Sequence, residues 1–134
     1  MAEKFVGMVA LKAIIVHEGR VLLMQNAQDS KWQFPGGRMH VGEKPEEGVR
    51  REVKEELGVD VLPTSVVQTD VFQNAQNEPV LVLMFLCGLL DNVTDLKGDG
   101  KEVKDFRWVG PDEIASLDIW PVYIEPLKKV LLGN

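Results

Sequence analysis

Apolar stretches separated by short polar segments run along most of the chain. β-Branched and aliphatic residues dominate these stretches, which is typical of buried strands. We therefore predict strands over residues 6–16, 21–25, 59–71, 80–90 and 103–109. Polar segments rich in turn-forming residues join them, of which residues 17–20 and 73–78 are the clearest.

The segment that begins at Pro45 has a helical period instead. Val49, Val53 and Leu57 are spaced by four residues, so one face of a helix carries all of them. Proline is favoured at the first position of a helix, and glycine, here Gly58, is typical just past its end. The pattern therefore predicts a helix that runs from Pro45 to Leu57.

Two further helical segments follow near the end of the chain. A short helix opens at Pro111, and residues 121–132 form a C-terminal helix with Pro126 as a candidate break. Strands outnumber helices, and the helices are interspersed among them. This order predicts an α+β fold, or an α/β/α sandwich around a mixed sheet. The length of 134 residues suggests one domain, which we expect to span residues 1–134.

Charge and cysteine content narrow the class of partner. The net charge of −6 argues against a basic surface for long nucleic acids, although a small phosphorylated substrate remains compatible when bound cations reverse the local field. The longest apolar stretch, residues 80–90, is too short to span a bilayer, so we expect no membrane partner. The N-terminus lacks a signal-peptide pattern. We interpret the single cysteine, Cys87, as a small buried hydrophobic residue of a protein in a reducing compartment. We therefore expect a cytoplasmic protein.

Three glutamates, Glu52, Glu55 and Glu56, crowd together on the predicted helix. At about 100° per residue, they fall within an arc of roughly 100°. Like charges this close repel by about 1 kcal/mol per pair in water, and several-fold more near a protein surface. Taken alone they fit a solvated acidic face, but a hard divalent metal would also relieve the repulsion and prefers oxygen ligands.

The glutamates belong to a longer pattern with fixed spacing. Gly37 is followed after five residues by Glu43, and seven more residues lead to Arg51, the glutamate cluster and Gly58. This pattern, over residues 37–59, resembles the Nudix box of the Nudix (MutT-like) hydrolases, and every fixed position is filled. Residues 32–37 and 107–114 also look Nudix-like. The resemblance implies the Nudix fold, an α/β/α sandwich with a mixed sheet.

An activity follows from the resemblance. The family cleaves a nucleoside diphosphate linked to another group, so the resemblance implies a small nucleotide diphosphate substrate and a Mg²⁺ cofactor, with Mn²⁺ as a substitute. Hydrolysis of (d)NTPs, including oxidised ones, in a house-cleaning role is the leading interpretation, because no extra domain is present for a large second moiety. Since dimers are common in the family, a homodimer is a candidate assembly.

Other interpretations stay open beside it. Hydrolysis of ADP-ribose, nucleotide sugars or dinucleoside polyphosphates is one, although residues 74–77 carry neither the proline nor the tyrosine that marks two of these subgroups. A catalytically silent nucleotide sensor is another, but such domains typically lose box carboxylates. An isomerase-like relative would want a reactive cysteine in the site, whereas Cys87 lies in an apolar segment.

Residue roles carry over by resemblance. The implied metal ligands are three carboxylates and one backbone carbonyl: Glu52, Glu55, Glu56 and Gly37. One of the glutamates is a candidate for orienting or deprotonating the attacking water. Arg51 resembles the residue that orients a box glutamate, and Glu43 is expected to brace the loop against the helix through Arg51.

Four further positions complete the expectation. Glu102, on a glycine-containing loop, is a candidate general base or extra metal ligand, with a solvated loop charge as its alternative. Arg38 is a candidate phosphate contact, with a variable loop residue as its alternative, and Trp32 is a candidate to stack on the nucleobase or to anchor the loop in the core. Gly48 stands where the family more often has alanine, and we expect it to leave room beside the acidic face.

Overall fold

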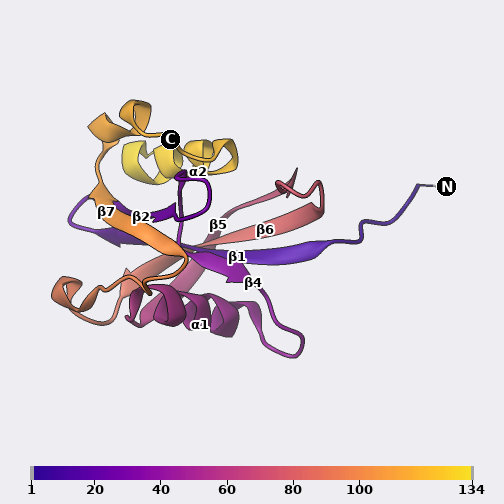
Figure 1. The fold of residues 1–134 in the computed structure, drawn as a ribbon, viewed down its shortest axis with the longest axis horizontal. Helices are drawn as coiled ribbons and strands as arrows, with labels where there is room; N and C mark the ends of the chain where they lie inside the picture. The colour runs from indigo at the N-terminus through magenta and orange to yellow at the C-terminus, as the bar shows by residue number, and fades with distance from the viewer. Residues whose placement is uncertain (1, 134) are drawn as a thin grey trace.

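A computed structural model of the chain describes residues 2–133. A seven-stranded mixed sheet lies between two helices, with α1 on one face and α2 on the other (Figure 1). The strands are β1 (Met8–His17), β2 (Arg20–Asn26), β3 (Trp32–Gln33), β4 (Gly36–Arg38), β5 (Val61–Gln73), β6 (Pro79–Leu89) and β7 (Val103–Val109). The helical segments are α1 (Pro45–Leu57), η1 (Val93–Asp95), η2 (Pro111–Ser116) and α2 (Pro121–Leu132). The predicted sandwich around a mixed sheet is confirmed.

Strand β1 is the centre of the sheet. It pairs in parallel with β6 along most of its length, and antiparallel with β4 and with the beginning of β2. The order is β3-β2-β1-β6-β5, and β7 pairs with the free side of β2. Parallel pairing of β1 with β6 requires a long crossover, and the segment that contains α1 and β5 supplies it. Pairing of β1 with β4 brings the Gly36-Gly37 backbone beside Leu11 and Lys12.

The hydrophobic pattern located the main elements well. Both long helices begin and end at the predicted residues, and α2 continues through Pro126 without a break. Gly58 ends α1 with a positive φ of 73°, and its N–H donates to the Lys54 carbonyl. The predicted short helix at Pro111 is a 3-10 helix. The short strands β3 and β4 were not predicted.

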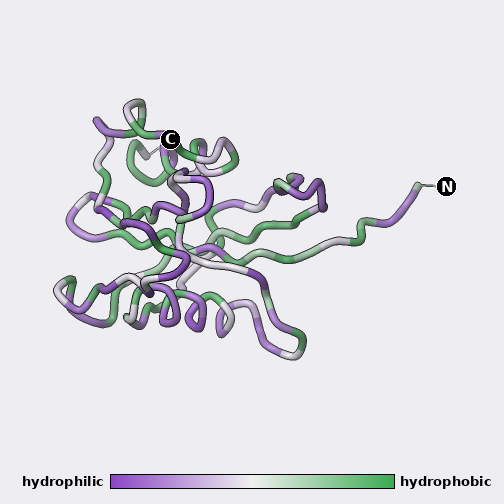
Figure 2. The backbone as a smooth tube through the Cα atoms, in the orientation of Figure 1, coloured by the Kyte–Doolittle hydropathy of each residue, from purple (hydrophilic) through white to green (hydrophobic). Residues whose placement is uncertain are grey.

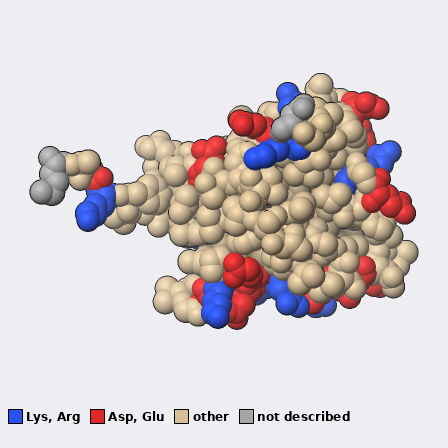
Figure 3. Space-filling model, turned by 180° about the vertical axis from the view of Figure 1, so that it is seen from behind, with Lys and Arg blue, Asp and Glu red and all other residues tan. Residues whose placement is uncertain are grey.

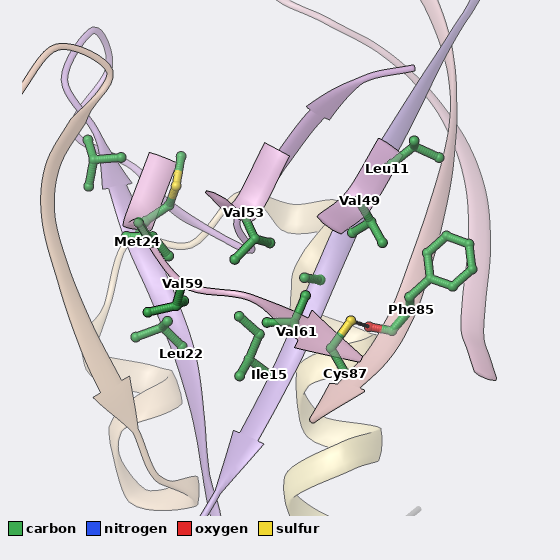
Figure 4. Close-up of a cluster of buried hydrophobic side chains, with 13 residues drawn as sticks. Leu11, Ile15, Leu22, Met24, Val49, Val53, Val59, Val61, Phe85 and Cys87 are labelled. Atoms are coloured by element: carbon green, nitrogen blue, oxygen red, sulfur yellow. Dashed lines mark hydrogen bonds between the residues drawn. The ribbon is translucent and has the colours of Figure 1, made fainter. Parts of the chain in front are cut away.

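Two apolar clusters fill the space on the two faces of the sheet. The cluster between α1 and the sheet contains Val49 and Val53 of α1 opposite strand residues such as Ile15 and Val61 (Figure 4). Cys87 belongs to this cluster, and burial raises the pKa of its thiol to about 12. The strand β6 is largely hydrophobic, whereas α1 carries hydrophilic residues on much of its length (Figure 2). The apolar face of α1 thus packs on the sheet, and its charged face takes part in the site described below.

The strand β5 forms the outer edge of the sheet next to β6. Its pairing with β6 shifts register twice, between Pro63 and Ser65 and between Val66 and Gln68. Several of its apolar side chains are exposed, namely Leu62, Val66 and Val71. Seen from behind, the molecule shows a broad uncharged centre with charged side chains gathered toward its edges (Figure 3). Across residues 2–133, no helix has the length and apolarity to cross a membrane.

Candidate active site

The loop that precedes α1 approaches the helix closely because of two glycines. Gly36 has a φ of 143°, and a side chain there would collide with the Leu11 carbonyl. A Cβ on Gly37 would lie 2.6 Å from a carboxylate oxygen of Glu52. The glycines therefore let the loop backbone lie directly against the acidic face of α1.

Glu56 is the buried member of the glutamate cluster. Its side chain is only 3% exposed, and Oε1 accepts a 2.7 Å hydrogen bond from the Gly36 N–H. Burial raises the pKa of its carboxyl to about 8, and the nearby Glu52 and Glu102 also act to raise it, while Lys12 and the Gly36 hydrogen bond oppose this. An anionic Glu56 is thus unfavourable here unless further positive charge is bound beside it.

Arg51 and Glu43 join the loop to the helix. The Arg51 guanidinium donates from Nε and Nη2 to the two carboxylate oxygens of Glu43, at 3.0 and 2.8 Å. These bonds, together with one from the His40 backbone N–H, lower the pKa of Glu43 to about 2. Arg51 also donates to the Arg38 carbonyl at 3.1 Å. The expected brace between Glu43 and Arg51 is therefore present in the structure.

The same guanidinium reaches the other glutamates. Its Nη1 lies 2.9 Å from Glu52 Oε1 and 3.3 Å from both oxygens of Glu55. Arg51 thus holds two of the box carboxylates side by side. Gly48 lies beneath this network, where an added Cβ would meet Leu11 and, at 2.7 Å, Glu43 Oε1. The glycine therefore leaves room for the Glu43 carboxylate, in line with its expected role.

One cavity collects most of the charged residues predicted for the site. Its lining residues are His40, Arg51, Glu52, Glu55, Glu56, Asp99, Lys101 and Glu102. Glu102 comes from the loop before β7 and so joins the α1 glutamates from outside the box. Acidic side chains outnumber basic ones in this cavity, and a hard divalent cation matches such a set of oxygen donors.

The carboxylates do not form a closed cage of their own. Within residues 2–133, no three His, Cys, Asp or Glu side chains converge as a ready ligand set. Two of these carboxylates, Glu52 and Glu55, form ion pairs with Arg51 and so are not directed at a common point. The residues fit Mg²⁺, because this ion uses only a few carboxylates and keeps substrate oxygens and waters as its other ligands.

A second cavity lies on the other side of the Gly37 loop. Its volume is about 240 Å³, a little below the usual range of small-molecule sites. Its lining includes two aromatic side chains from the α2 region and several amide and charged groups, among them Lys12, Gln33, Gly37, Arg38, Trp120 and Tyr123. Gly37 lies between the two cavities: it lines this one, and a Cβ added to it would lie 2.6 Å from Glu52, which lines the acidic one.

The two predicted substrate-contact residues are placed differently. Arg38 lines the second cavity with its exposed side chain, which lies 3.8 Å from Glu78. Trp32 is 7% exposed and packs in the apolar cluster on the α2 side of the sheet, away from both cavities. Of the two roles considered for Trp32, the structure places it as the anchor of the loop. Trp120 lines the cavity instead, and its indole N–H donates to Asp29 at 3.0 Å.

Lys12 and Gln33 were not predicted as site residues. Lys12 interrupts an otherwise apolar strand segment, and a single charge at an inward-facing strand position is the signal that could have identified it. Gln33 lies between two aromatic residues and has no comparable signal in the sequence. Its partner Lys12, which donates to the Gln33 amide oxygen, approaches it only in the folded chain.

Residues 8–130 of the chain match the NUDIX domain family model. The chain belongs to the Nudix family. The nucleoside triphosphatase NudI of Escherichia coli O81 (strain ED1a) is 27% identical over 119 residues, covering 79% of this chain and 84% of the relative. The MutT protein of Methanosarcina mazei Go1 superposes with a TM-score of 0.80 at 23% identity, over 95% of this chain and 94% of that chain.

A third relative widens the range of Nudix activities. An ADP-ribose pyrophosphatase from Streptococcus suis 89-1591 superposes with a TM-score of 0.72 at 25% identity, over 96% of this chain and 92% of that chain. The protein is therefore a Nudix hydrolase, an enzyme of the pyrophosphohydrolase class that acts on nucleotide-derived substrates. Enzymes of this family generally use divalent metal ions such as Mg²⁺.

Proposed function

We propose that this Nudix hydrolase is a Mg²⁺-dependent pyrophosphohydrolase of nucleoside triphosphates, including oxidised ones, in a house-cleaning role. The observation that carries the proposal is the pair of cavities joined at Gly37, one acidic and one lined by aromatic and amide groups. A nucleotide can place its base in the second cavity and its phosphates beside the glutamates. The resemblance to NudI, a nucleoside triphosphatase, supports this choice of substrate.

The proposed roles follow the position of each side chain. Metal ligation is assigned to Glu52, Glu55, Glu56 and the Gly37 carbonyl. The bound ion would neutralise charge on the phosphoryl oxygens and lower the pKa of a bound water. Arg51, held by Glu43, keeps Glu52 and Glu55 in position, and Arg38 at the mouth of the second cavity contacts a phosphate.

Glu102 is assigned to proton transfer from the attacking water. It comes from the loop before β7 and lines the same acidic cavity as the α1 glutamates. A carboxylate within reach of the water accepts its proton as the phosphorus–oxygen bond forms. Substitution of Glu102 by glutamine is expected to lower kcat more than it raises KM, because the proton acceptor is lost while substrate contacts remain.

The principal test is a phosphate-release screen with Mg²⁺ and with Mn²⁺. The substrates are nucleoside triphosphates, ADP-ribose, nucleotide sugars and dinucleoside polyphosphates. We expect the highest kcat/KM with a triphosphate, whereas the absence of turnover with every diphosphate linkage would rule the proposal out. Preferred turnover of ADP-ribose would favour the second candidate function, which the resemblance to the Streptococcus suis pyrophosphatase supports.

A matched substitution separates catalysis from folding. We expect Glu56→Gln to lower kcat by orders of magnitude while circular dichroism shows an intact fold, because the amide is nearly isosteric but loses the charge. Near-normal kcat in this variant would contradict the metal assignment.

We also propose that the enzyme acts in the cytoplasm as a homodimer. Light scattering of the purified protein tests the proposed assembly.

A further inference from the structure

A buried lysine lies at the floor of the second cavity. Lys12, on β1, is 6% exposed, and its ammonium group donates to three oxygens. These are Gln33 Oε1 at 3.0 Å, the Phe34 carbonyl at 3.2 Å and the Gly36 carbonyl at 3.4 Å. Because an ammonium group has three donors, all of them are engaged within the protein.

This arrangement fixes the orientation of the Gln33 amide. Lys12 can only donate, so the amide atom that faces it must be the oxygen, and the amide nitrogen points elsewhere. No described residue accepts a hydrogen bond from Gln33 Nε2, and no side-chain nitrogen or oxygen buried within residues 2–133 lacks a partner. Since Gln33 is 9% exposed and lines the cavity, its amide nitrogen is the part that contacts the cavity.

The orientation limits what Gln33 can recognise. A free glutamine pairs with adenine through both amide atoms, donating to one ring position and accepting from the amino group. With its oxygen turned toward Lys12, Gln33 presents its two amide N–H donors to the cavity and directs its acceptor away from it. It therefore complements an oxo group and does not complement an exocyclic amino group.

We propose that Gln33, oriented by Lys12, is a specificity-determining residue that selects nucleotides whose base carries an oxo group at the purine 6 or pyrimidine 4 position. This proposal rests on the nucleotide pyrophosphohydrolase function proposed above. The base, not the phosphate chain, is the group it contacts, because the phosphates belong beside the glutamates of the other cavity. The aromatic side chains of Trp120 and Tyr123 line the same cavity, which suits an aromatic base.

Two pairs of substrates test the selection directly. ITP and ATP differ at purine position 6 and its adjoining ring nitrogen, and UTP and CTP differ in the same way at pyrimidine position 4. We expect kcat/KM to favour ITP over ATP and UTP over CTP by about tenfold or more, the effect of one buried hydrogen bond. Equal kcat/KM within the hydrolysed pairs, or a preference for the amino member, would overturn the proposal.

Variants then assign the preference to Gln33. In Gln33→Met the ratio of oxo to amino substrate is expected to fall toward one, and in Gln33→Glu it is expected to fall further, because the carboxylate can accept from an amino group. The matched control is Gln68→Met on β5, which lines neither cavity and is expected to keep the wild-type ratio. An unchanged ratio in Gln33→Met would overturn the assignment, whatever happens to the absolute rate.

A change at Lys12 tests the orientation itself. In Lys12→Met the amide of Gln33 is free to rotate, so the ratio is expected to fall although Gln33 is still present. Retention of the full ratio in a folded Lys12→Met protein would overturn the role of Lys12, and if that variant does not fold, the Gln33 variants still decide the proposal. Failure of the wild-type enzyme to hydrolyse any nucleotide would instead reject the proposed function.

Discussion

At the scale of single residues, Glu56 combines burial with a charge that its proposed role as a metal ligand requires. Its pKa is raised from 4.5 to about 8, so folding favours the protonated carboxyl. The stability this group contributes is full below pH 4.5 and is lost as the pH rises through 8. The metal-free enzyme therefore holds an unfavourable carboxylate at alkaline pH.

The first prediction concerns that pH dependence. Between pH 5 and pH 9 the unfolding free energy of the wild-type protein in EDTA is expected to fall by about 4 kcal/mol through this group, at about 1.4 kcal/mol per pKa unit. Glu56→Gln removes the titration, so its unfolding free energy is expected to exceed that of the wild type at pH 9. Urea unfolding at both pH values measures these free energies. An equal change in unfolding free energy between pH 5 and pH 9 in the two proteins would contradict the prediction.

The second prediction concerns Gly37. Gly37→Ala places a Cβ against the Glu52 carboxylate, which must move because the loop backbone cannot. We expect kcat/KM to fall by about ten- to a hundredfold, because Glu52 is a proposed metal ligand and moving it disturbs the metal site. We expect little change in melting temperature. Gly88→Ala is the control, since open space surrounds that position on β6. Normal activity in Gly37→Ala would show that the close approach is dispensable.

At the scale of elements, α1 is specified by residues close together in the sequence, whereas the strands of the loop before it form through contacts with distant residues. Pro45, the four-residue apolar spacing and Gly58 lie within the helix or next to it, so the sequence predicts its limits correctly. Strands β3 and β4 are two and three residues long, and β4 exists through pairing with β1, more than 20 residues away in the sequence. Trp32 was ambiguous for the same reason, because its environment is formed by residues near Ile119.

The third prediction tests how the loop is tied to α1. Arg51→Lys keeps the charge but cannot form the paired hydrogen bonds to Glu43 while also reaching Glu52 and Glu55. We expect the apparent Mg²⁺ affinity or kcat to fall by about ten- to a hundredfold. Arg50→Lys on the same helix is the control, since Arg50 pairs with Asp60 outside both cavities. Mg²⁺ titration of the reaction rate measures the difference, and similar curves for the two variants would contradict it.

At the scale of the whole molecule, β1 lies between the two sides of the site, because its neighbouring residues point to opposite faces of the sheet. Leu11 packs in the apolar cluster beneath α1, the helix that carries the glutamates of the acidic cavity, whereas Lys12, the next residue, lines the second cavity. The box motif is local in sequence, so the sequence could predict the acidic cavity. The second cavity combines residues from β1, β3, β4, β5 and the α2 region. These residues are far apart in the sequence, so no local pattern predicts that they lie together.

The fourth prediction uses the linkage between metal binding and folding. Mg²⁺ at a hundred times its dissociation constant is expected to stabilise the folded enzyme by about 2.7 kcal/mol. The stabilisation should be smaller in Glu56→Gln, which lacks one proposed ligand charge. Differential scanning fluorimetry with Mg²⁺ or EDTA measures it, with Ca²⁺ as a comparison ion. An equal rise in melting temperature for both proteins would place the ion elsewhere.

The edge strand β5 has a consequence for the behaviour of the enzyme at high concentration. A long strand with unpaired backbone groups and exposed Leu62, Val66 and Val71 is a template for intermolecular strand addition. The two register shifts against β6 disturb the regular spacing of that edge, and Pro63 removes one N–H donor from it. The irregular pairing of β5 thus disfavours amyloid-like aggregation. Restoring a regular register between β5 and β6 would make this edge more prone to intermolecular strand addition.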